Sequence, residues 1–353
     1  MSESSFVRVS PMFHTPFRSP VFVLVQCYLN FVRPYAAMNI LLTTPAAPGS
    51  RHGNRATAER WTAFFRRMGH SVSVEEEWTD GDADMMVALH ARRSHPSIRR
   101  FAAAHPNRPL IVAFTGTDLY RDIHTDGDAQ KSLELATRLV VLQEAGILEL
   151  DPRLQRKTSV VRQSAESFRR EEPDADAFEV CVVGHLRDEK DPFRAAVAAD
   201  LLPTESRIRV VHLGGAREEL FASKARSHMA DNPRYRWLGE VSHERVREIL
   251  ARTRLLVQSS FMEGGANAVS EALAGGVPVI ASHIPGNVGM LGEDYPAYFP
   301  AGDERHLARL LQRAESDPAF YALLEEKCAA RRELFSPERE YAALERLLDD
   351  AIR

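Results

Sequence analysis

Cysteine is scarce in this sequence, and its cysteines lie far apart. Cys27, Cys181 and Cys328 are the only three, and their spacing matches neither a disulfide framework nor a zinc motif. Free thiols suit a reducing compartment, so we expect a cytoplasmic protein. The histidines also lack metal-ligand spacing, and no bound metal is expected.

A large charge imbalance and long apolar runs are missing as well. The formal net charge of the 353 residues is −4, which gives no reason to expect nucleic acid or an anionic membrane as a partner. The apolar run at 21–32 is shorter than the roughly twenty residues that a spanning helix needs, and no good signal-peptide cleavage site follows it. We expect residues 1–37 to be an extension outside the fold, which then begins at Met38.

Two familiar enzyme motifs are absent or out of place. No Gly-x-Gly-x-x-Gly occurs, so a nicotinamide-dependent dehydrogenase is unsupported. Asp82-Ala83-Asp84 has the spelling of a metal-binding Asp-x-Asp, but it precedes a strand pattern in an acidic loop. We interpret it as structural.

Strand and helix patterns alternate after Met38. The continuous apolar run at 39–44 is typical of a buried parallel strand, and Gly69 is placed to end the first helix. Such alternation predicts an α/β fold with a parallel sheet covered by helices. The expected strands are 39–44, 71–76, 85–90, 109–116 and 139–143, and the expected helices are 56–69, 94–106 and 129–137.

The pattern restarts after a polar, acidic, Pro-containing stretch at 166–177, which we interpret as a linker. Strand patterns follow at 178–186, 207–215, 234–241 and 255–260, with a helix at 244–254 and a mostly helical tail from about 304. We therefore expect two doubly wound, Rossmann-like domains facing across a cleft, with ligands beyond the carboxyl ends of the strands. The expected parts are an acceptor domain at 38–165, a donor domain at 178–325, and helices at 326–353 that pack back on the first domain.

The stretch FMEGGANAVSEALAGG, residues 261–276, places two glutamates around the start of a helix. Glu263 falls on a loop after a strand, and Glu271 falls about one turn inside the helix. Free amides at a helix start favour an anion, and glycine allows close approach to the backbone. A nucleotide sugar fits, with its diphosphate at the helix start and its hydroxyls on the two acids. The simpler alternative is a glycine-capped surface helix with two solvated glutamates.

Two further loops of the same domain support a nucleotide-sugar site. Arg187 and Lys190 lie three apart beyond a strand, where two cations would stabilise the charge of a leaving diphosphate. Leu238 and Gly239 form a turn at the end of the strand pattern that begins at 234. This turn is well placed to contact a base through the backbone. A solvated charged loop remains the alternative for 187–190.

The chain from Phe178 to about Phe299 resembles the donor domain of GT-B glycosyltransferases, close to the retaining family 4 type. The resemblance implies that Glu271 holds the ribose hydroxyls and that Glu263 faces the sugar or its leaving phosphate. With Arg187 and Lys190, Glu263 would be catalytic. The family's aromatic Gly-Phe-Gly is replaced here, so the sugar contacts are expected from Gly264, Gly265, Ala266 and Asn267.

The N-terminal half is similar to the selenosugar synthases of selenoneine biosynthesis, through TPAAPGSRHGNRATAERW, ALHARRSHPSI, TGTDLYRDI and VVLQEAG. The resemblance implies a UDP-N-acetylglucosamine donor, a selenophosphate acceptor, and a 1-selenosugar product released with UDP and phosphate. No cofactor is implied beyond these small-molecule substrates. Other enzymes of that pathway, which supply selenophosphate or use the selenosugar, are the candidate partners.

The loops of the N-terminal half suit a small, highly charged acceptor. PGSRHGN runs into a helix and offers backbone amides beside a guanidinium, and HARRS and TGTD follow the next strands. Solvated Arg92-Arg93 and a structural His90 are the alternatives. The expected acceptor-binding residues are Gly49, Ser50, Arg51, Gly53, Asn54, His90, Arg92, Thr115 and Thr117.

The acceptor also decides the mechanism expected from the sequence. A hydroxyl acceptor needs a general base, for which Asp118 is the spare candidate, whereas anionic selenophosphate needs none. Catalysis would then rest on positioning and on Arg187 and Lys190. Three alternatives stay open: a glycosyltransferase with an ordinary hydroxyl or thiol acceptor, a UDP-sugar 2-epimerase, and a catalytically idle nucleotide-sugar-binding module.

Overall fold

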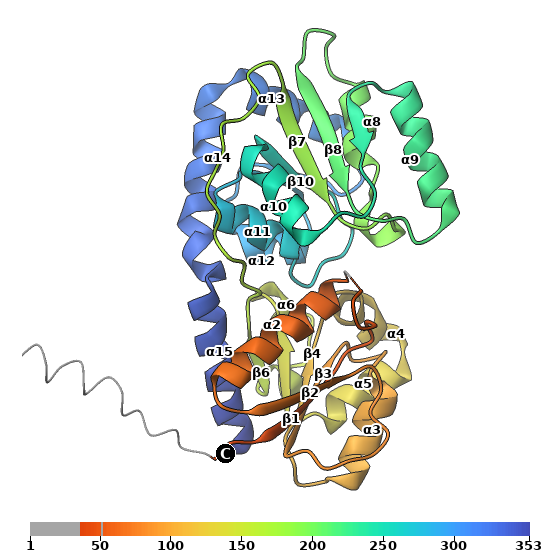
Figure 1. The fold of residues 1–353 in the computed structure, drawn as a ribbon, viewed down its shortest axis with the longest axis vertical. Coiled ribbons are helices and arrows are strands. Elements are labelled where there is room, and N and C mark those ends of the chain that lie inside the picture. Colours follow the sequence, from red (N-terminus) through yellow and green to blue (C-terminus); the bar gives the residue numbers. More distant parts are fainter. Residues whose placement is uncertain (1–35, 51) are drawn as a thin grey trace, which may run out of the picture. The chain divides into compact units, whose positions relative to one another are not determined.

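Two parallel six-stranded sheets form the framework of the protein (Figure 1). A computed structural model describes residues 36–353 except Arg51. Residues 37–353 form one unit, and the extension expected at 1–37 lies outside the described residues apart from Ala36 and Ala37. No helix among the described residues is long and apolar enough to cross a membrane.

The first sheet has the strand order β2-β1-β3-β4-β5-β6, and every pair in it is parallel. Its central strands are fully buried apolar runs, as expected for strands covered on both faces. The strands are β1 (Asn39–Thr43), β2 (Ser71–Glu75), β3 (Met85–Leu89), β4 (Leu110–Ala113), β5 (Arg138–Val141) and β6 (Thr158–Val160).

Helices cover both faces of this sheet because its strand side chains alternate in direction. Leu41, Met86 and Val112 pack in one cluster with Phe101 of α3 (His95–Ala104) and Leu133 of α5 (Gly127–Leu135). The opposite face meets α2 (Gly53–Arg67), whose Trp61 and Phe65 are fully buried. Short helical segments complete the domain: η1 (Asp118–Asp122), α4 (Ile123–Thr125), α6 (Ala145–Leu148) and α7 (Pro152–Gln155).

The second sheet repeats this plan with the order β12-β11-β10-β7-β8-β9. One large cluster of buried residues joins its strands to the surrounding helices. The strands are β7 (Phe178–Val183), β8 (Ile208–Leu213), β9 (Tyr235–Trp237), β10 (Leu255–Gln258), β11 (Val279–Ser282) and β12 (Tyr298–Phe299). The helical segments are η2 (Asp188–Lys190), α8 (Arg194–Asp200), α9 (Glu219–Asp231), α10 (His243–Arg252), α11 (Asn267–Gly275), α12 (Pro285–Leu291), α13 (Glu304–Ser316) and α14 (Pro318–Arg331).

The C-terminal helices connect the two domains. Phe320, Leu324 and Cys328 of α14 belong to the core of the second domain, and η3 (Arg332–Phe335) leads into α15 (Pro337–Ile352). The carboxylate of Glu340 on α15 is 1% exposed and accepts a 2.7 Å bond from Trp61 Nε1 of α2. The chain therefore returns to the first domain at its end, as Figure 1 shows.

Sequence and structure differ where side chains bend the backbone locally. The strand expected at 109–116 ends at Ala113, because Asp118 Oδ1 accepts bonds from the backbone amides of Thr115 and Gly116 and folds the loop toward η1. The edge strand β6 was not expected. Residues 166–172 of the expected linker contain neither helix nor strand, and Phe168 packs its ring directly on Gly275 of α11.

Each sheet has one point where the strand order reverses, between β1 and β3 in the first and between β7 and β10 in the second. Ligands of doubly wound sheets bind beyond the carboxyl ends of the strands at such points. The fold thus directs attention to the loops after β1, β3, β7 and β10. The α/β class with two doubly wound domains, expected from the sequence, is confirmed.

Candidate active site

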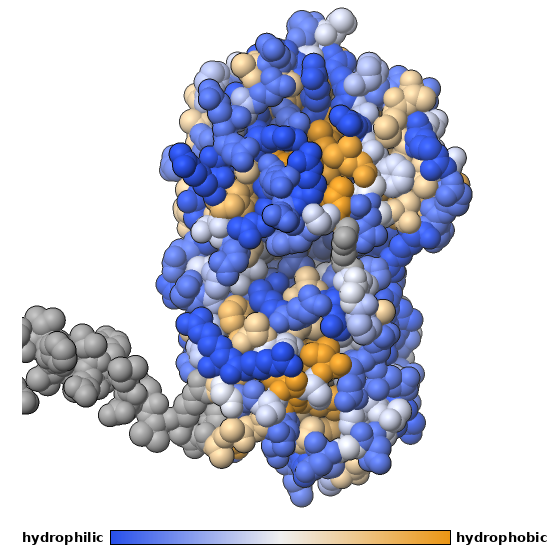
Figure 2. Space-filling model, viewed as in Figure 1, coloured by the Kyte–Doolittle hydropathy of each residue, from blue (hydrophilic) through white to orange (hydrophobic). Residues whose placement is uncertain are grey.

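A cavity of about 720 Å³ lies where loops of both sheets meet. Its volume is in the range of small-molecule sites, roughly 300–1,000 Å³. Its walls come from the segments after β1, β3 and β4 on one side and after β7, β8, β9 and β10 on the other. The cavity therefore lies beyond the carboxyl ends of the strands, at the points where the strand order of each sheet reverses. On the face shown in Figure 2 the surface is mostly hydrophilic, with hydrophobic residues in small separate patches.

Most residues expected from the sequence line this one cavity. They include both glutamates, both cations of the 187–190 loop, and most of the N-terminal loop residues. The expected residues found in its walls are Gly49, Ser50, Gly53, Asn54, His90, Thr115, Thr117, Arg187, Lys190, Glu263, Gly265, Ala266, Asn267 and Glu271.

Four expected residues do not line the cavity. Arg92 Nε instead binds Asp122 Oδ2 at 2.7 Å, and its neighbour Arg93 lines the cavity. Gly264 packs against the backbone of the first domain. Leu238 and Gly239 bind neighbouring backbone through Leu238 N and Gly239 O, and the cavity wall begins one residue later. Arg51 lies outside the described residues.

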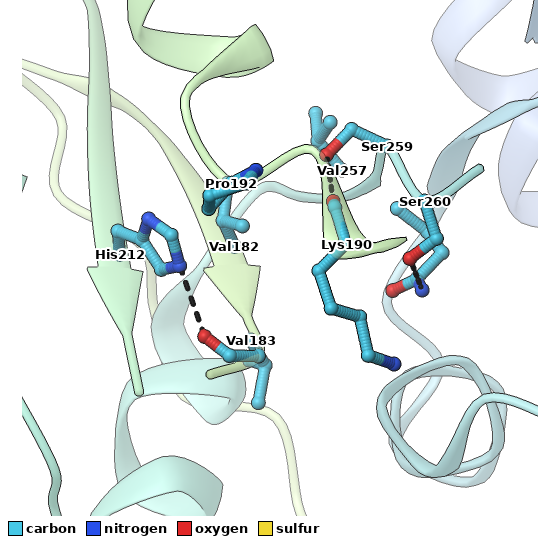
Figure 3. A pocket seen from close by; sticks show the side chains of 10 residues that line it. Val182, Val183, Lys190, Pro192, His212, Val257, Ser259 and Ser260 are labelled. Atoms are coloured by element: carbon cyan, nitrogen blue, oxygen red, sulfur yellow. Dashed lines mark hydrogen bonds between the residues drawn. The ribbon is translucent and has the colours of Figure 1, made fainter. Parts of the chain in front are cut away.

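Glu263 is a buried carboxylate held by three donors. It is 6% exposed, and its Oε1 accepts bonds from Gln258 Nε2 at 2.7 Å, from Ser260 Oγ at 2.5 Å and from Lys190 Nζ. Lys190 is anchored at its backbone, where its carbonyl accepts from Ser259 Oγ at 3.1 Å (Figure 3). Part of the Lys190 charge is therefore already neutralised by Glu263, and Arg187 is the freer cation of the pair.

The carboxylate of Glu271 contacts the imidazole of an exposed histidine. Its Oε1 lies 3.2 Å from Nε2 of His243, the first residue of α10, and this carboxylate raises the pKa of the imidazole. The Glu271 side chain is 16% exposed and that of His243 is 69% exposed. A ligand hydroxyl that binds Glu271 would have to share it with this exposed imidazole.

Two helix starts point into the cavity from opposite sides. Neither α2 nor α11 has a side chain that caps its N-terminus, so the first amides of both helices keep their partial positive charge. A Cβ on Gly53, at the start of α2, would lie 3.4 Å from Nδ2 of Asn267, at the start of α11. An anion between the two helices would be attracted by both.

The glycines after Glu263 serve contact between the domains. A Cβ on Gly264 would lie 2.9 Å from the backbone nitrogen of Gly116, and a Cβ on Gly265 would lie 2.8 Å from Cβ of Leu142. Real Cβ atoms essentially never come this close to another heavy atom, so a side chain at either position would displace its neighbour. A large aromatic residue at 265 would collide with Leu142.

Asp118 is structural. It is fully buried, does not line the cavity, and accepts bonds from the amides of Ala91, Thr115 and Gly116. It also lies beside His90, a residue with positive φ of 76° whose Nε2 is 3.3 Å from Thr117 Oγ1. Burial lowers the pKa of this histidine, and the neutral ring contributes hydrogen-bonding capacity without charge.

Several basic residues in the cavity were not among the expected site residues. Arg217 follows β8, and His52 and His185 form an edge-to-face ring pair with centroids 5.4 Å apart. His52 and His185 stand inside the loops PGSRHGN and GHLRDEK, directly after β1 and β7. Position after a strand end at the reversal point is the signal that could have found them. No group of three or more potential metal ligands occurs among the described residues.

A comparison with protein families finds a match in the part of the chain that forms the second sheet. Residues 163–332 match the family described as glycosyl transferases group 1. The matched range is 170 of the 353 residues, just under half of the chain. The matched range contains Arg187, Lys190, Glu263 and Glu271 together with α11, whereas the N-terminal loops of the cavity lie outside it.

Solved structures resemble the matched range and the first domain together. HepE of Anabaena, in complex with UDP and glucose, matches with a TM-score of 0.72 and 14% identity over 88% of this chain and 99% of its own. Sucrose-phosphate synthase of Thermosynechococcus elongatus gives 0.68 and 15% over 88% and 98%. A glycosyltransferase of Rickettsia africae gives 0.67 and 12% over 90% and 99%. At these identities the likeness establishes the fold, and the GT-B expectation is confirmed.

Proposed function

We propose that this protein transfers the sugar of UDP-N-acetylglucosamine to selenophosphate. The selenium forms a bond to C1 of the sugar while the bond from C1 to the β-phosphate oxygen breaks, and UDP leaves with the electron pair. Water then cleaves the Se–P bond, which gives phosphate and the 1-selenosugar. The observation that carries the proposal is one cavity in which Arg187, Lys190 and the start of α11 lie opposite basic residues of the first domain such as Arg93.

The donor half of the proposal is supported by the family match and by α11. The uncapped start of α11 favours the diphosphate, and Glu271 is placed one turn inside the helix to accept from the ribose hydroxyls. The structurally similar HepE is in complex with UDP and glucose, which supports the same type of donor here. Arg187 would neutralise the leaving diphosphate, because no carboxylate among the described residues pairs with it.

The assignment of an anionic acceptor is supported by Asp118, the base candidate from the sequence, because this carboxylate is not available to a substrate. Asp118 holds backbone amides and has no exposed surface, and Glu263 is paired with Lys190. A hydroxyl acceptor would need a proton acceptor in reach. An acceptor that is already anionic and nucleophilic removes this requirement and fits the arginines of the cavity.

One incubation tests the proposal. The protein is mixed with UDP-N-acetylglucosamine, with and without selenophosphate, and UDP and the sugar products are followed by mass spectrometry. We expect UDP release that depends on selenophosphate, with a selenium-containing sugar as product. Release that requires an alcohol or a thiol instead would overturn the acceptor assignment, and formation of the 2-epimer would identify an isomerase.

A variant separates the roles of the two cations. Arg187→Ala should lower the turnover number about 100-fold, in the range seen when one donor to a developing anion is lost. UDP binding measured by calorimetry controls for loss of the nucleotide site. An unchanged turnover number with a raised KM for the donor would show that Arg187 binds the ground state and the transition state equally and does not accelerate the chemical step.

A further inference from the structure

The cavity contains a cationic group that extends beyond the diphosphate grip. Arg93 follows β3 in the first sheet, and Arg217 follows β8 in the second. The ring pair of His52 and His185, with centroids 5.4 Å apart, lies in the same cavity. We call Arg93, Arg217 and the ring pair His52–His185 the cationic wall, after its two arginines.

The arginines of this region lack the acidic partners that neighbouring cations have. Among the described residues, no ion pair joins Arg93, Arg187 or Arg217 to a carboxylate, whereas Arg92 pairs with Asp122 at 2.7 Å. Nε of Arg187 is buried and has no hydrogen-bond partner within the described part of the chain. These guanidinium groups are available to an anion from outside.

The cations also repel one another. Burial, followed by the nearby charges of Arg187 and Arg93, lowers the pKa of Arg217. Burial, followed by Arg217, His185 and Arg187, lowers the pKa of His52. Glu240 acts on His52 and Glu189 acts on Arg217 with the opposite sign, so part of this positive charge is offset. Like charges that are only partly compensated favour an anion that joins them, so the wall suits an anionic ligand.

In the order of the strands, the cationic wall is set apart from the start of α11. The start of α11 follows β10, and the order β10-β7-β8 places the loop of Arg217 two strands away in the sheet. Arg93 belongs to the other sheet altogether. The cationic wall therefore extends from the α11 end of the cavity toward β8 and the first domain.

We propose that Arg93 and Arg217 bind a second phosphate group, distinct from the donor diphosphate, which is the phosphoryl end of the acceptor. Assigning this phosphate to the acceptor rests on the proposed function. Guanidinium groups bind phosphate oxygens in pairs of parallel bonds, and two of them from different domains would fix the phosphorus. The selenium would then be directed away from them, toward the sugar.

Orthophosphate tests the subsite without any reaction. It is titrated into the protein in the absence of UDP and into the protein saturated with UDP, with heat as the readout. We expect binding in both cases and a loss of about tenfold or more in phosphate affinity for Arg93→Gln and for Arg217→Gln, with UDP affinity changed less than about threefold. Failure of phosphate to bind the UDP complex, with UDP affinity falling in both variants, would assign the arginines to the donor.

Two exposed arginines serve as matched controls. Arg99 lies on α3 near Arg93, and Arg209 lies on β8 before Arg217; neither lines the cavity. Arg99→Gln and Arg209→Gln remove the same charge and should leave phosphate affinity unchanged. An equal loss of phosphate affinity in these controls would show that the loss comes from the changed net charge of the protein, which would overturn the proposed subsite.

Steady-state kinetics then connect the subsite to the acceptor. With selenophosphate as substrate, Arg93→Gln and Arg217→Gln should raise its KM about tenfold or more and leave the donor KM unchanged. An unchanged selenophosphate KM would overturn the inference while leaving the proposed function intact. If the protein binds phosphate but does not use selenophosphate as a substrate, the phosphate subsite is supported and the proposed acceptor is overturned.

Discussion

At the scale of single residues, one buried carboxylate joins three separate segments of the chain. Glu340 accepts bonds from Trp61 Nε1 and Arg60 Nε of α2, both at 2.7 Å, and from the backbone amide of Ser164 at 2.8 Å. Arg60 and Ser164 also line the cavity. The contact that attaches α15 to the first domain is thus continuous with a wall of the site.

Replacing this carboxylate should destabilise the protein strongly. Glu340→Ala leaves an indole, a guanidinium and an amide without their acceptor in a buried place, which costs about 3 kcal/mol and should lower the Tm by about 6 °C. Thermal unfolding followed by circular dichroism measures the change. Glu338→Ala, an exposed glutamate of the same helix, is the control, and similar behaviour of the two variants would contradict this account.

Residue types in the site were predictable from the sequence, but their partners were only partly so. The spacing of Glu263 and Glu271 and the cations at 187 and 190 indicated the site, because loops after parallel strands meet at one edge. The pairing of Lys190 with Glu263 joins residues far apart in the chain. Which of Arg92 and Arg93 faces the cavity depends on Asp122, which no local pattern reveals.

At the scale of elements, two loops from different domains touch through their backbones. Gly264 follows β10 and Gly116 follows β4, and a methyl group on Gly264 would lie 2.9 Å from the Gly116 nitrogen. The loop that carries Glu263 is therefore positioned partly by the first domain. Glycine at this position sets how closely the two loops approach.

Gly264→Ala should reduce catalysis more than stability. The added methyl group displaces the loop, and a shift of about 1 Å at a reacting centre lowers the turnover number by roughly tenfold to 100-fold. Turnover and Tm are measured together. Gly127→Ala, where a Cβ would meet nothing within 4 Å, is the matched control, and unchanged turnover in Gly264→Ala would show that the contact does not position Glu263.

A buried histidine connects β8 to the end of β7 and makes stability depend on pH. Burial lowers the pKa of His212 to about 4 from 6.5, while its Nε2 lies 3.1 Å from the carbonyl of Gly184. The unfolded chain takes up this proton near pH 6.5 and the folded chain only near pH 4. The free energy of unfolding therefore falls as the pH is lowered through this window.

His212→Gln removes this titration and tests it. The difference in unfolding free energy between pH 7 and pH 4.5 should be smaller in the variant than in the unmodified protein, by up to about 3 kcal/mol. Urea unfolding at several pH values measures it. Parallel pH profiles for the two proteins would show that His212 is not the group responsible.

The elements themselves were largely predictable. Apolar runs such as 39–43 and 85–89 indicate buried strands because parallel strands are covered on both faces. The edge strand β6 is short and half-buried, so it has no such run. The turn at 118–122 depends on the long-range bonds of Asp118 to Ala91, which a local pattern does not contain.

At the scale of the whole molecule, one group of arginines in the site has the opposite charge to the chain. The formal net charge is −4, while Arg93, Arg187 and Arg217 face one cavity. Such a concentration of positive charge attracts anionic substrates into the cavity against the average field of the protein.

Salt should therefore weaken substrate capture. Between about 50 and 500 mM NaCl, kcat/KM for an anionic acceptor should fall about tenfold, because the screening length shortens severalfold. Arg217→Gln should show a shallower dependence than Arg209→Gln. Identical slopes for the two variants would mean that the field of the cavity does not depend on the cationic wall.

The three tryptophans provide optical reporters of separate regions. The Trp61 indole is fully buried against Glu340, Trp78 is 3% exposed in the core of the first domain, and Trp237 donates to the Gly214 carbonyl in the loop that precedes Arg217. Emission from Trp61 should shift to longer wavelength when α15 detaches, and emission from Trp237 should respond to occupation of the neighbouring wall. A pair of Trp→Phe replacements would leave one indole at a time and resolve these events without any added label.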